Sequence, residues 1–140
     1  MSALLFGHDE LVAEWVSKQP YGKPFHPPFT AFGVMAPDGS LRGGFVFTTY
    51  TGSSVNLSLA GRGVAQRSNW RAVLHYVFEQ MGCSRMECHT AASNKIVRRN
   101  LPQLGFKFEG VARRLYGKED GLCFSLTVDD LDGFRRRWRL

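Results

Sequence analysis

The sequence has few cysteines and no long apolar run, and both features exclude classes of protein. Its three cysteines, Cys83, Cys88 and Cys123, are an odd number without a C-x-x-C pair, which argues against a disulfide framework and a zinc site. No stretch approaches the roughly 18 uninterrupted apolar residues of a membrane helix. The first six residues lack the basic region of a signal peptide. We therefore expect a cytoplasmic protein without a membrane span and without a bound metal.

The chain is short and basic. Its 140 residues are 44% hydrophobic and 13% aromatic, enough for one core but not comfortably for two. With no internal repeat or low-complexity tract, we expect a single domain, either monomeric or homodimeric. The 18 basic and 12 acidic residues give a charge of +6. That balance favours an anionic partner without identifying it, so nucleic acid, a phosphorylated cofactor and an anionic surface all remain open.

The first half of the sequence predicts one helix and an antiparallel meander. An acidic first turn at Asp9 begins a short amphipathic helix containing Leu11, which ends before Pro20. The proline-rich residues 21–29 cannot join the middle of a sheet and are expected as an extended loop. Three β-rich segments separated by turn residues are expected as strands: residues 30–35, 44–50 and 55–59.

The second half alternates helices and strands. A long helix carrying an apolar stripe from Trp70 to Met81 is followed by a strand at residues 85–90 and a helix at 95–104. A strand then starts at Phe106. The Asp120-Gly121 pair predicts a closing hairpin, with strands at 110–116 and 122–128 and a helical turn at 129–131. The class is α+β, with a mostly antiparallel sheet that includes one parallel crossover.

The entrance to the long helix has the composition of an anion site. Glycines 61 and 63 and two arginines come directly before the apolar stripe. Unpaired backbone N–H groups and the helix dipole favour a phosphate at such a position. The expected pyrophosphate contacts are the backbone N–H groups of Val64, Ala65, Gln66, Arg67, Ser68 and Asn69, helped by the guanidinium of Arg62 or Arg67.

The residues after this helix carry a family resemblance. Ser93-Asn94-Lys95 is followed by Leu104-Gly105-Phe106-Lys107-Phe108-Glu109-Gly110 and by Arg113. They resemble the signature of the GNAT superfamily of N-acetyltransferases, within the branch of ribosomal-protein N-terminal and small phage-type acetyltransferases. The resemblance is clear over about residues 55–128. It implies that residues 1–140 form one GNAT-like acyltransferase domain, with a splayed central strand pair and flanking helices.

The resemblance also implies a reaction and a site. Acetyl-CoA would lie between the splayed strands, and its acetyl group would pass directly to a primary amine of a protein N-terminus, a lysine or a small molecule. The backbone N–H of Leu59 would stabilise the oxyanion. Asn94 would bind the pantetheine arm, although Asn is also a common helix N-cap. Arg98 would reach the adenosine phosphates, unless it belongs to a solvated basic face.

Two proton-transfer groups of the family are missing. Leu101 stands where many relatives carry a tyrosine acid, and Asn56 and Ser58 occupy the strand that often carries a base carboxylate. His89 or Glu87 could accept a proton in their place. The alternative for each residue is an ordinary surface or core role without catalysis. Cys88 is expected to be a buried structural thiol.

Two further points concern binding partners. The aromatic residues Tyr21, Phe25 and Phe29 could form the wall of a substrate entrance, but the acceptor itself has no motif. The alternative function is a catalytically weak or inactive GNAT-like module that binds nucleic acid or another anionic partner. Its basic aromatic tail, residues 135–139, would then contact phosphates and bases.

Overall fold

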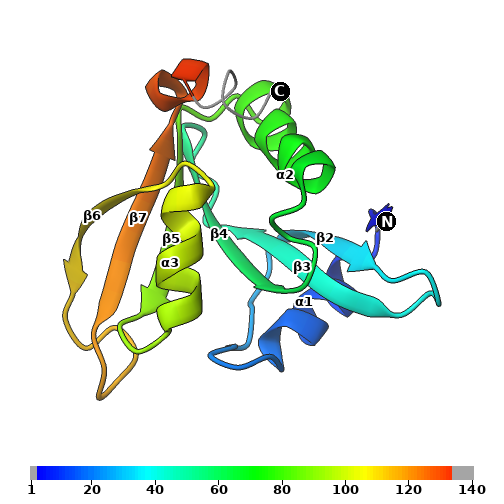
Figure 1. Cartoon of the computed structure of the whole chain (residues 1–140), viewed down its shortest axis with the longest axis horizontal. Helices are drawn as coiled ribbons and strands as arrows, with labels where there is room; N and C mark the ends of the chain where they lie inside the picture. The colour runs from blue at the N-terminus through cyan, green and yellow to red at the C-terminus, as the bar shows by residue number, and fades with distance from the viewer. Residues whose placement is uncertain (1–2, 134–140) are drawn as a thin grey trace.

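The computed structural model describes residues 3–133, which build one seven-stranded sheet with helices on both faces (Figure 1). The strand order is β1-β2-β3-β4-β5-β7-β6. The elements in chain order are β1 (Ala3–Leu5), α1 (Asp9–Ser17), β2 (Thr30–Met35), β3 (Leu41–Thr48), β4 (Ser54–Gly61), α2 (Arg67–Leu74), a π-helical segment (His75–Gln80), β5 (Arg85–Ala91), α3 (Lys95–Gln103), β6 (Lys107–Ala112), β7 (Gly121–Thr127) and a 3₁₀ turn (Val128–Asp130).

Pairing in the sheet confirms the predicted class. Strands β4 and β5 pair in parallel, whereas the other neighbouring pairs are antiparallel. The meander was therefore predicted correctly, although β3 begins at Leu41 rather than at residue 44, and β1 was not predicted. No helix in residues 3–133 is long and apolar enough to cross a membrane.

Alternate residues of the central strands are buried in two separate hydrophobic clusters, one on each face of the sheet. In β3, Phe45 and Phe47 belong to a large cluster with residues of α2 and α3, while Val46 belongs to a smaller cluster with α1. Successive strand residues face opposite sides of a sheet. Helix α1 therefore covers one face, and α2 and α3 cover the other.

Helix α1 has the predicted position but a rotated buried face. It buries Val12, Ala13 and Val16, whereas Leu11 is 55% exposed. The Asp9 carboxylate accepts a hydrogen bond from the Ala31 backbone N–H at 3.1 Å. This bond joins the start of α1 to β2, with the buried face of the helix against the sheet.

The predicted long helix is α-helical only in its first half. From His75 to Gln80 it becomes a π-helix, a form in which backbone hydrogen bonds span one extra residue. The stripe still points inward, because Trp70, Val73 and Val77 are fully buried. The Trp70 indole N–H donates to the Leu104 carbonyl at 3.2 Å, which ties α2 to the end of α3.

The closing hairpin differs from its prediction. Strand β6 ends at Ala112, and residues 113–120 form a loop instead of a strand running to residue 116 with a tight Asp-Gly turn. The Asp120 carboxylate accepts from the Arg114 backbone N–H at 2.9 Å, and Tyr116 N–H donates to the Glu119 carbonyl at 3.0 Å. These local bonds replace the ladder. The expected helical turn at 129–131 is present as the 3₁₀ turn Val128–Asp130.

A polar group links the three strands at the β6 edge. Arg85 on β5 donates to the Glu109 carboxylate on β6 at 2.8 Å, and the Ser125 hydroxyl on β7 donates to the same carboxylate at 2.7 Å. The hydrogen bond from Arg85, followed by that from Ser125, lowers the pKa of Glu109 from 4.5 to about 2. The ion pair between Arg85 and Glu109 thus stabilises the sheet edge only while Glu109 is ionised.

We predict that Glu109→Gln lowers the free energy of unfolding by about 1 kcal/mol near neutral pH, because Glu109 is 39% exposed and solvent weakens the pair. Since its folded pKa is depressed, the contribution is complete above about pH 4.5 and is lost as the pH falls toward about 2. Urea unfolding at pH 7 and pH 3 measures this difference, with the exposed Asp132→Asn as control. An equal effect of Glu109→Gln at both pH values would contradict the assignment.

Candidate functional site

Strands β4 and β5 separate part of the way along their length. Their parallel pairing runs from Ser54 opposite Arg85 to Asn56 opposite Glu87, but β4 continues to Gly61 and β5 to Ala91. The later residues of both strands are therefore not joined across the sheet. This is the splayed central pair that the family resemblance implied.

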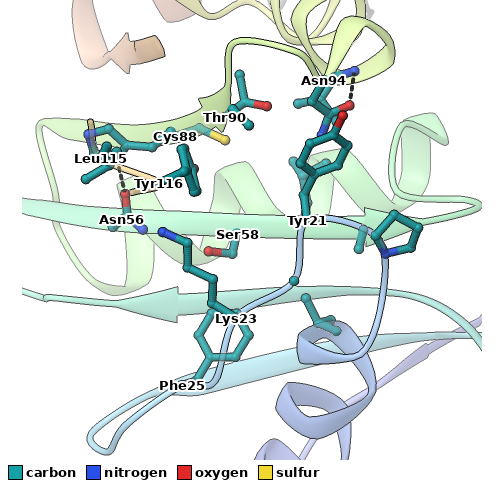
Figure 2. Close-up of a pocket in the computed structure, with 18 of the residues that line it drawn as sticks. Tyr21, Lys23, Phe25, Asn56, Ser58, Cys88, Thr90, Asn94, Leu115 and Tyr116 are labelled. Carbon is teal, nitrogen blue, oxygen red and sulfur yellow. Dashed lines mark hydrogen bonds between the residues drawn. The ribbon is translucent and has the colours of Figure 1, made fainter. Parts of the chain in front are cut away.

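A cavity of about 300 Å³ lies at this divergence (Figure 2). Its lining comes from the ends of β4 and β5, the segment after α1, the start of α3 and the loop 113–120. Tyr21 and Phe25 line it as expected, but Phe29 lies in a separate hollow with Tyr76 and Met81. The described lining contains no aspartate or glutamate.

The backbone of β4 faces this gap at Leu59. The Arg62 N–H donates to the Arg42 carbonyl at 2.7 Å, which identifies a hydrogen-bonded pair between β4 and β3. Such pairs alternate along an antiparallel ladder, and the β3–β4 register is unbroken. Counted back in twos, the bonded residues of β4 are even-numbered. Leu59 therefore directs its N–H and C=O away from β3, toward the side where β5 has diverged.

The glycine loop follows directly from the cavity. Leu59 and Ala60 line the cavity, and Gly61 and Gly63 come next with φ angles of +88° and +81°. A side chain would be strained at either angle, and a Cβ on Gly63 would lie 2.8 Å from a Val34 methyl group. The loop therefore requires glycine at both positions.

The loop brings several predicted phosphate donors to one helix end. Gln66 is the N-cap of α2, and the first helical bond is from Trp70 N–H to the Gln66 carbonyl. The N–H groups of Arg67, Ser68 and Asn69 precede this bond, so they have no partner within the helix. The side chains of Arg62, Arg67 and Ser68 are exposed and that of Val64 is buried.

Two predicted donors also have roles inside the loop. The Gln66 backbone N–H donates to the Gly63 carbonyl at 3.2 Å, so it is not free for a phosphate. The Asn69 side chain is buried, and its amide donates to the same carbonyl at 2.8 Å. Asn69 therefore fixes the loop through its side chain, a role that the sequence reasoning missed.

The predicted contacts on α3 also have structural roles. Asn94 lines the cavity and caps α3, since its side-chain oxygen accepts from the Val97 N–H at 3.4 Å. The capping alternative is thus present whether or not Asn94 also binds a ligand. Arg98 is exposed and donates to the Ala92 carbonyl at 2.7 Å, so part of its guanidinium is already occupied.

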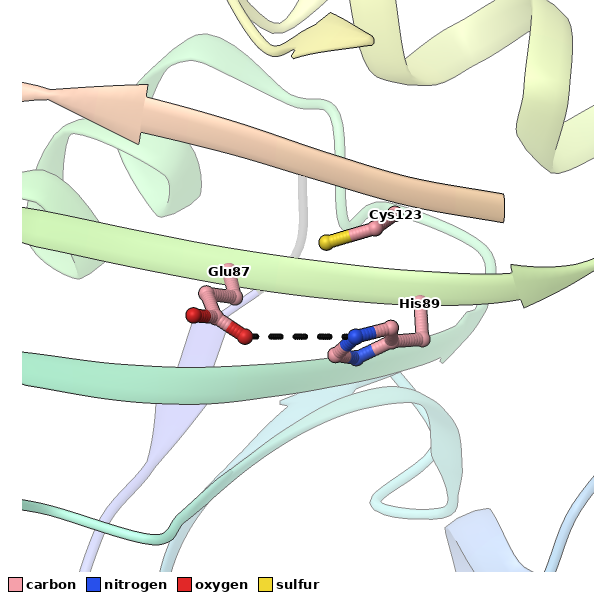
Figure 3. Close-up of side chains that lie close together, drawn as sticks. All are labelled: Glu87, His89 and Cys123. Atoms are coloured by element: carbon pink, nitrogen blue, oxygen red, sulfur yellow. Dashed lines mark ion pairs between the residues drawn. The ribbon is translucent and has the colours of Figure 1, made fainter. Parts of the chain in front are cut away.

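His89 lines the cavity in a fixed orientation. Its Nδ1 lies 3.1 Å from the Asn56 side-chain oxygen, and the Asn56 amide nitrogen donates to the Thr48 hydroxyl at 3.4 Å. With the amide oriented in this way, the neutral imidazole has its proton on Nδ1 and its lone pair on Nε2. The Nε2 atom is 3.9 Å from the Glu87 carboxylate (Figure 3).

The cavity also contains two side chains that the sequence did not indicate. Tyr116 comes from the loop 113–120, and the Lys23 ammonium lies 3.7 Å from the centroid of its ring (Figure 2). Burial raises the pKa of the Tyr116 phenol, which therefore stays protonated at neutral pH. On the opposite wall, the Tyr21 hydroxyl is hydrogen-bonded to Ser93 at 2.9 Å, which joins the segment after α1 to the turn before α3.

Cys88 behaves as expected. It is 2% exposed, and burial raises the pKa of its thiol to about 12, so it has no reactive thiolate. The basic aromatic tail at 135–139, one of the features behind the nucleic-acid alternative, lies outside the described residues.

The fold is shared with known acetyltransferases, whereas the sequence is distant from them. No protein-family model matches the chain, and no curated protein sequence matches it significantly. A protein of T. thermophilus assigned to the acetyltransferases is 17% identical over 81% of this chain and 66% of its own, with a TM-score of 0.70.

Two further solved structures have the same fold. The spermidine/spermine N-acetyltransferase SpeG of Vibrio cholerae is 13% identical over 97% of this chain and 99% of its own, with a TM-score of 0.70. A GNAT-family acetyltransferase of Bacillus anthracis is 19% identical over 69% of this chain and 65% of its own, with a TM-score of 0.58.

The comparisons establish the GNAT-like fold. The chain spans slightly less than two thirds of the length of several of these proteins, including 62% and 66% of two other acetyltransferases. The comparisons do not show whether the chain belongs to the ribosomal-protein or phage-type branch of the superfamily.

We predict that Asn69→Ala lowers the free energy of unfolding by about 0.5–1.5 kcal/mol, because the Gly63 carbonyl loses one of its two hydrogen-bond donors and keeps the Gln66 N–H. Urea unfolding measures the change. The control is Ser68→Ala, which alters an exposed neighbouring position of the same helix turn. If both variants are equally stable, Asn69 does not hold the loop.

Proposed function

We propose that this chain is an N-acetyltransferase that passes the acetyl group of acetyl-CoA directly to a primary amine. The observation that carries the proposal is a cavity between two diverging strands that continues into a glycine loop at a helix N-terminus. The cavity suits a thioester arm, and the helix end suits a pyrophosphate. The β4 wall of the cavity and the helix end are consecutive in the chain, from Leu59 to Asn69.

The proposed cofactor contacts follow this path. The pantetheine arm lies beside β4 and Asn94, and the pyrophosphate binds the loop and the first turn of α2. The donors are the backbone N–H groups of Val64, Ala65, Arg67, Ser68 and Asn69, with the guanidinium groups of Arg62 and Arg67 beside them. Arg98 contributes on the α3 side. Helix dipole and arginine charge both favour the phosphates.

The chemical step needs an oxyanion donor at the thioester. The amine nitrogen attacks the carbonyl carbon, the C–N bond forms, and negative charge develops on the carbonyl oxygen. We assign the Leu59 N–H to this oxygen, because β3 does not use it and it faces the cavity. A preorganised backbone donor of this kind typically contributes about 10²–10³-fold to the rate.

Proton transfer then falls to two side chains in the cavity. His89 Nε2 accepts the proton from the attacking amine, and the Glu87 carboxylate at 3.9 Å stabilises the imidazolium that results. As the C–S bond breaks, the Tyr116 phenol donates a proton to the CoA thiolate; the imidazolium then releases its proton to solvent and the phenolate takes one up, which restores both residues. Tyr116 thus supplies the acid missing at Leu101, from a different part of the fold.

The cavity also bears on the acceptor. SpeG acts on spermidine, a polyamine, but the described lining here offers no carboxylate for a second ammonium group. Lys23 adds a positive charge instead. The acceptor is therefore a primary amine without further positive charge near the reacting nitrogen, such as a protein N-terminus, a lysine in a neutral or acidic context, or a small molecule.

We predict that Arg67→Glu weakens CoA binding about tenfold, because it places negative charge beside the phosphates. Calorimetric titration with acetyl-CoA measures the dissociation constant. Lys118→Glu is the matched control, since it makes the same charge change in the loop 113–120. Folded wild-type protein that does not bind acetyl-CoA at millimolar concentration would refute the proposed cofactor.

We predict that His89→Gln lowers kcat by about 10²–10⁴-fold, because it removes the proton acceptor, while acetyl-CoA affinity stays near the wild-type value. Thiol release is followed over pH with peptides bearing a free N-terminus, lysine peptides and spermidine. The control is His75→Gln, an exposed histidine on the π-helical segment. Binding of acetyl-CoA without acetylation of any of these amines would reject the activity but not the cofactor site.

A further inference from the structure

Glu87, His89 and Cys123 bring three potential metal ligands to one point of the sheet (Figure 3). One ligand atom from each lies within 4.8 Å of the other two. Glu87 and His89 are two residues apart on β5 and share a face, while Cys123 on β7 is directly opposite His89. Sheet pairing therefore fixes the three positions relative to one another.

Two of the ligands are already held by neighbours. Asn56 occupies His89 Nδ1, which leaves the Nε2 lone pair facing Glu87. The Arg85 Nε donates to one Glu87 oxygen at 3.0 Å, so the other oxygen stays available. Second residues that orient metal ligands in this way are usual in metal sites.

Among the charged side chains bonded to one another beside the cluster, carboxylates outnumber cations. Arg85 contacts two carboxylates, those of Glu87 and Glu109, so these three groups have a net charge of −1 when all are ionised. All three ligand residues are partly exposed, and His89 lines the cavity. A metal ion could therefore reach the cluster from the cavity side.

We propose that Glu87, His89 and Cys123 form a binding site for one zinc ion, with a fourth position open to the cavity. A mixed oxygen, nitrogen and sulfur donor set suits zinc among the divalent metals. Zinc–ligand distances of about 2.0–2.3 Å place tetrahedral donors roughly 3.3–3.8 Å apart. The observed spacing needs only small side-chain rotations. On binding, the Cys123 thiol releases its proton to solvent and a Zn–S bond forms.

This site differs from the zinc sites excluded by the sequence. The absence of a C-x-x-C pair excludes ligands that are close in the chain, but Cys123 and His89 are 34 positions apart in the sequence and adjacent across the sheet. Cys88 lies between Glu87 and His89 on β5 and is buried toward the opposite face, so it does not contribute.

Cobalt and zinc titrations test the site without acetyl-CoA. Reduced, metal-free protein is titrated with Co²⁺, and thiolate-to-cobalt charge-transfer absorption reports a sulfur ligand. We expect this absorption to saturate at one equivalent, to be displaced by Zn²⁺, to disappear in Cys123→Ser and to persist in Cys83→Ser. Its absence from wild-type protein, or its survival in Cys123→Ser, would overturn the proposal.

The other two ligands are tested by calorimetry with Zn²⁺. We expect His89→Gln and Glu87→Gln each to weaken zinc binding at least about tenfold, and Asn56→Ala to weaken it about 10–100-fold by releasing the His89 ring. His75→Gln should leave the affinity unchanged. Wild-type affinity in His89→Gln would remove histidine from the site and overturn the three-ligand assignment.

Discussion

The early end of pairing between β4 and β5 is the constraint on which the rest of the site depends. A buried strand normally satisfies its N–H and C=O groups on both sides. Beyond Asn56, β4 has only β3 as a partner, so every second backbone unit faces the gap. Those groups need water or a ligand. The sheet thus provides polar backbone groups in the cavity wall that need no particular side chain.

Packing on the face of the sheet that α2 and α3 cover holds this gap open. Helix α2 follows β4 through the glycine loop, and its Trp70 is fully buried between the sheet and Phe106, with its indole bonded to Leu104. Helix α3 follows β5 after the Asn94 cap. The start of α2 is therefore tied to the end of α3, which fixes the helices that follow the two strands relative to each other. The strand ends cannot close without displacing that packing, which interiors resist.

Local sequence patterns predicted most helices and strands, but they did not predict contacts between segments that are distant in sequence. The apolar stripe from Trp70 and the cap at Asn94 depend on neighbours in sequence, so a single sequence contains their signal. The place of Tyr116 depends on hydrogen bonds inside the loop 113–120 that override the Asp-Gly hairpin signal. The roles of Lys23 and Cys123 could not be predicted, because each depends on a residue that is distant in sequence. Lys23 contacts Tyr116 and Cys123 pairs with His89, and no spacing rule links the members of either pair.

His89 shows why the proposed reaction and the proposed metal site cannot operate together. Its Nδ1 is occupied by Asn56, so one lone pair, on Nε2, must serve either the proton of the amine or the zinc ion. A ligated imidazole cannot accept a proton, and zinc would also withdraw the Glu87 carboxylate from the imidazolium. Zinc should therefore inhibit acetylation by wild-type protein. It should inhibit the Cys123→Ser variant far less. That change removes a metal ligand but leaves the proposed proton acceptor His89 and the proposed proton donor Tyr116 in place.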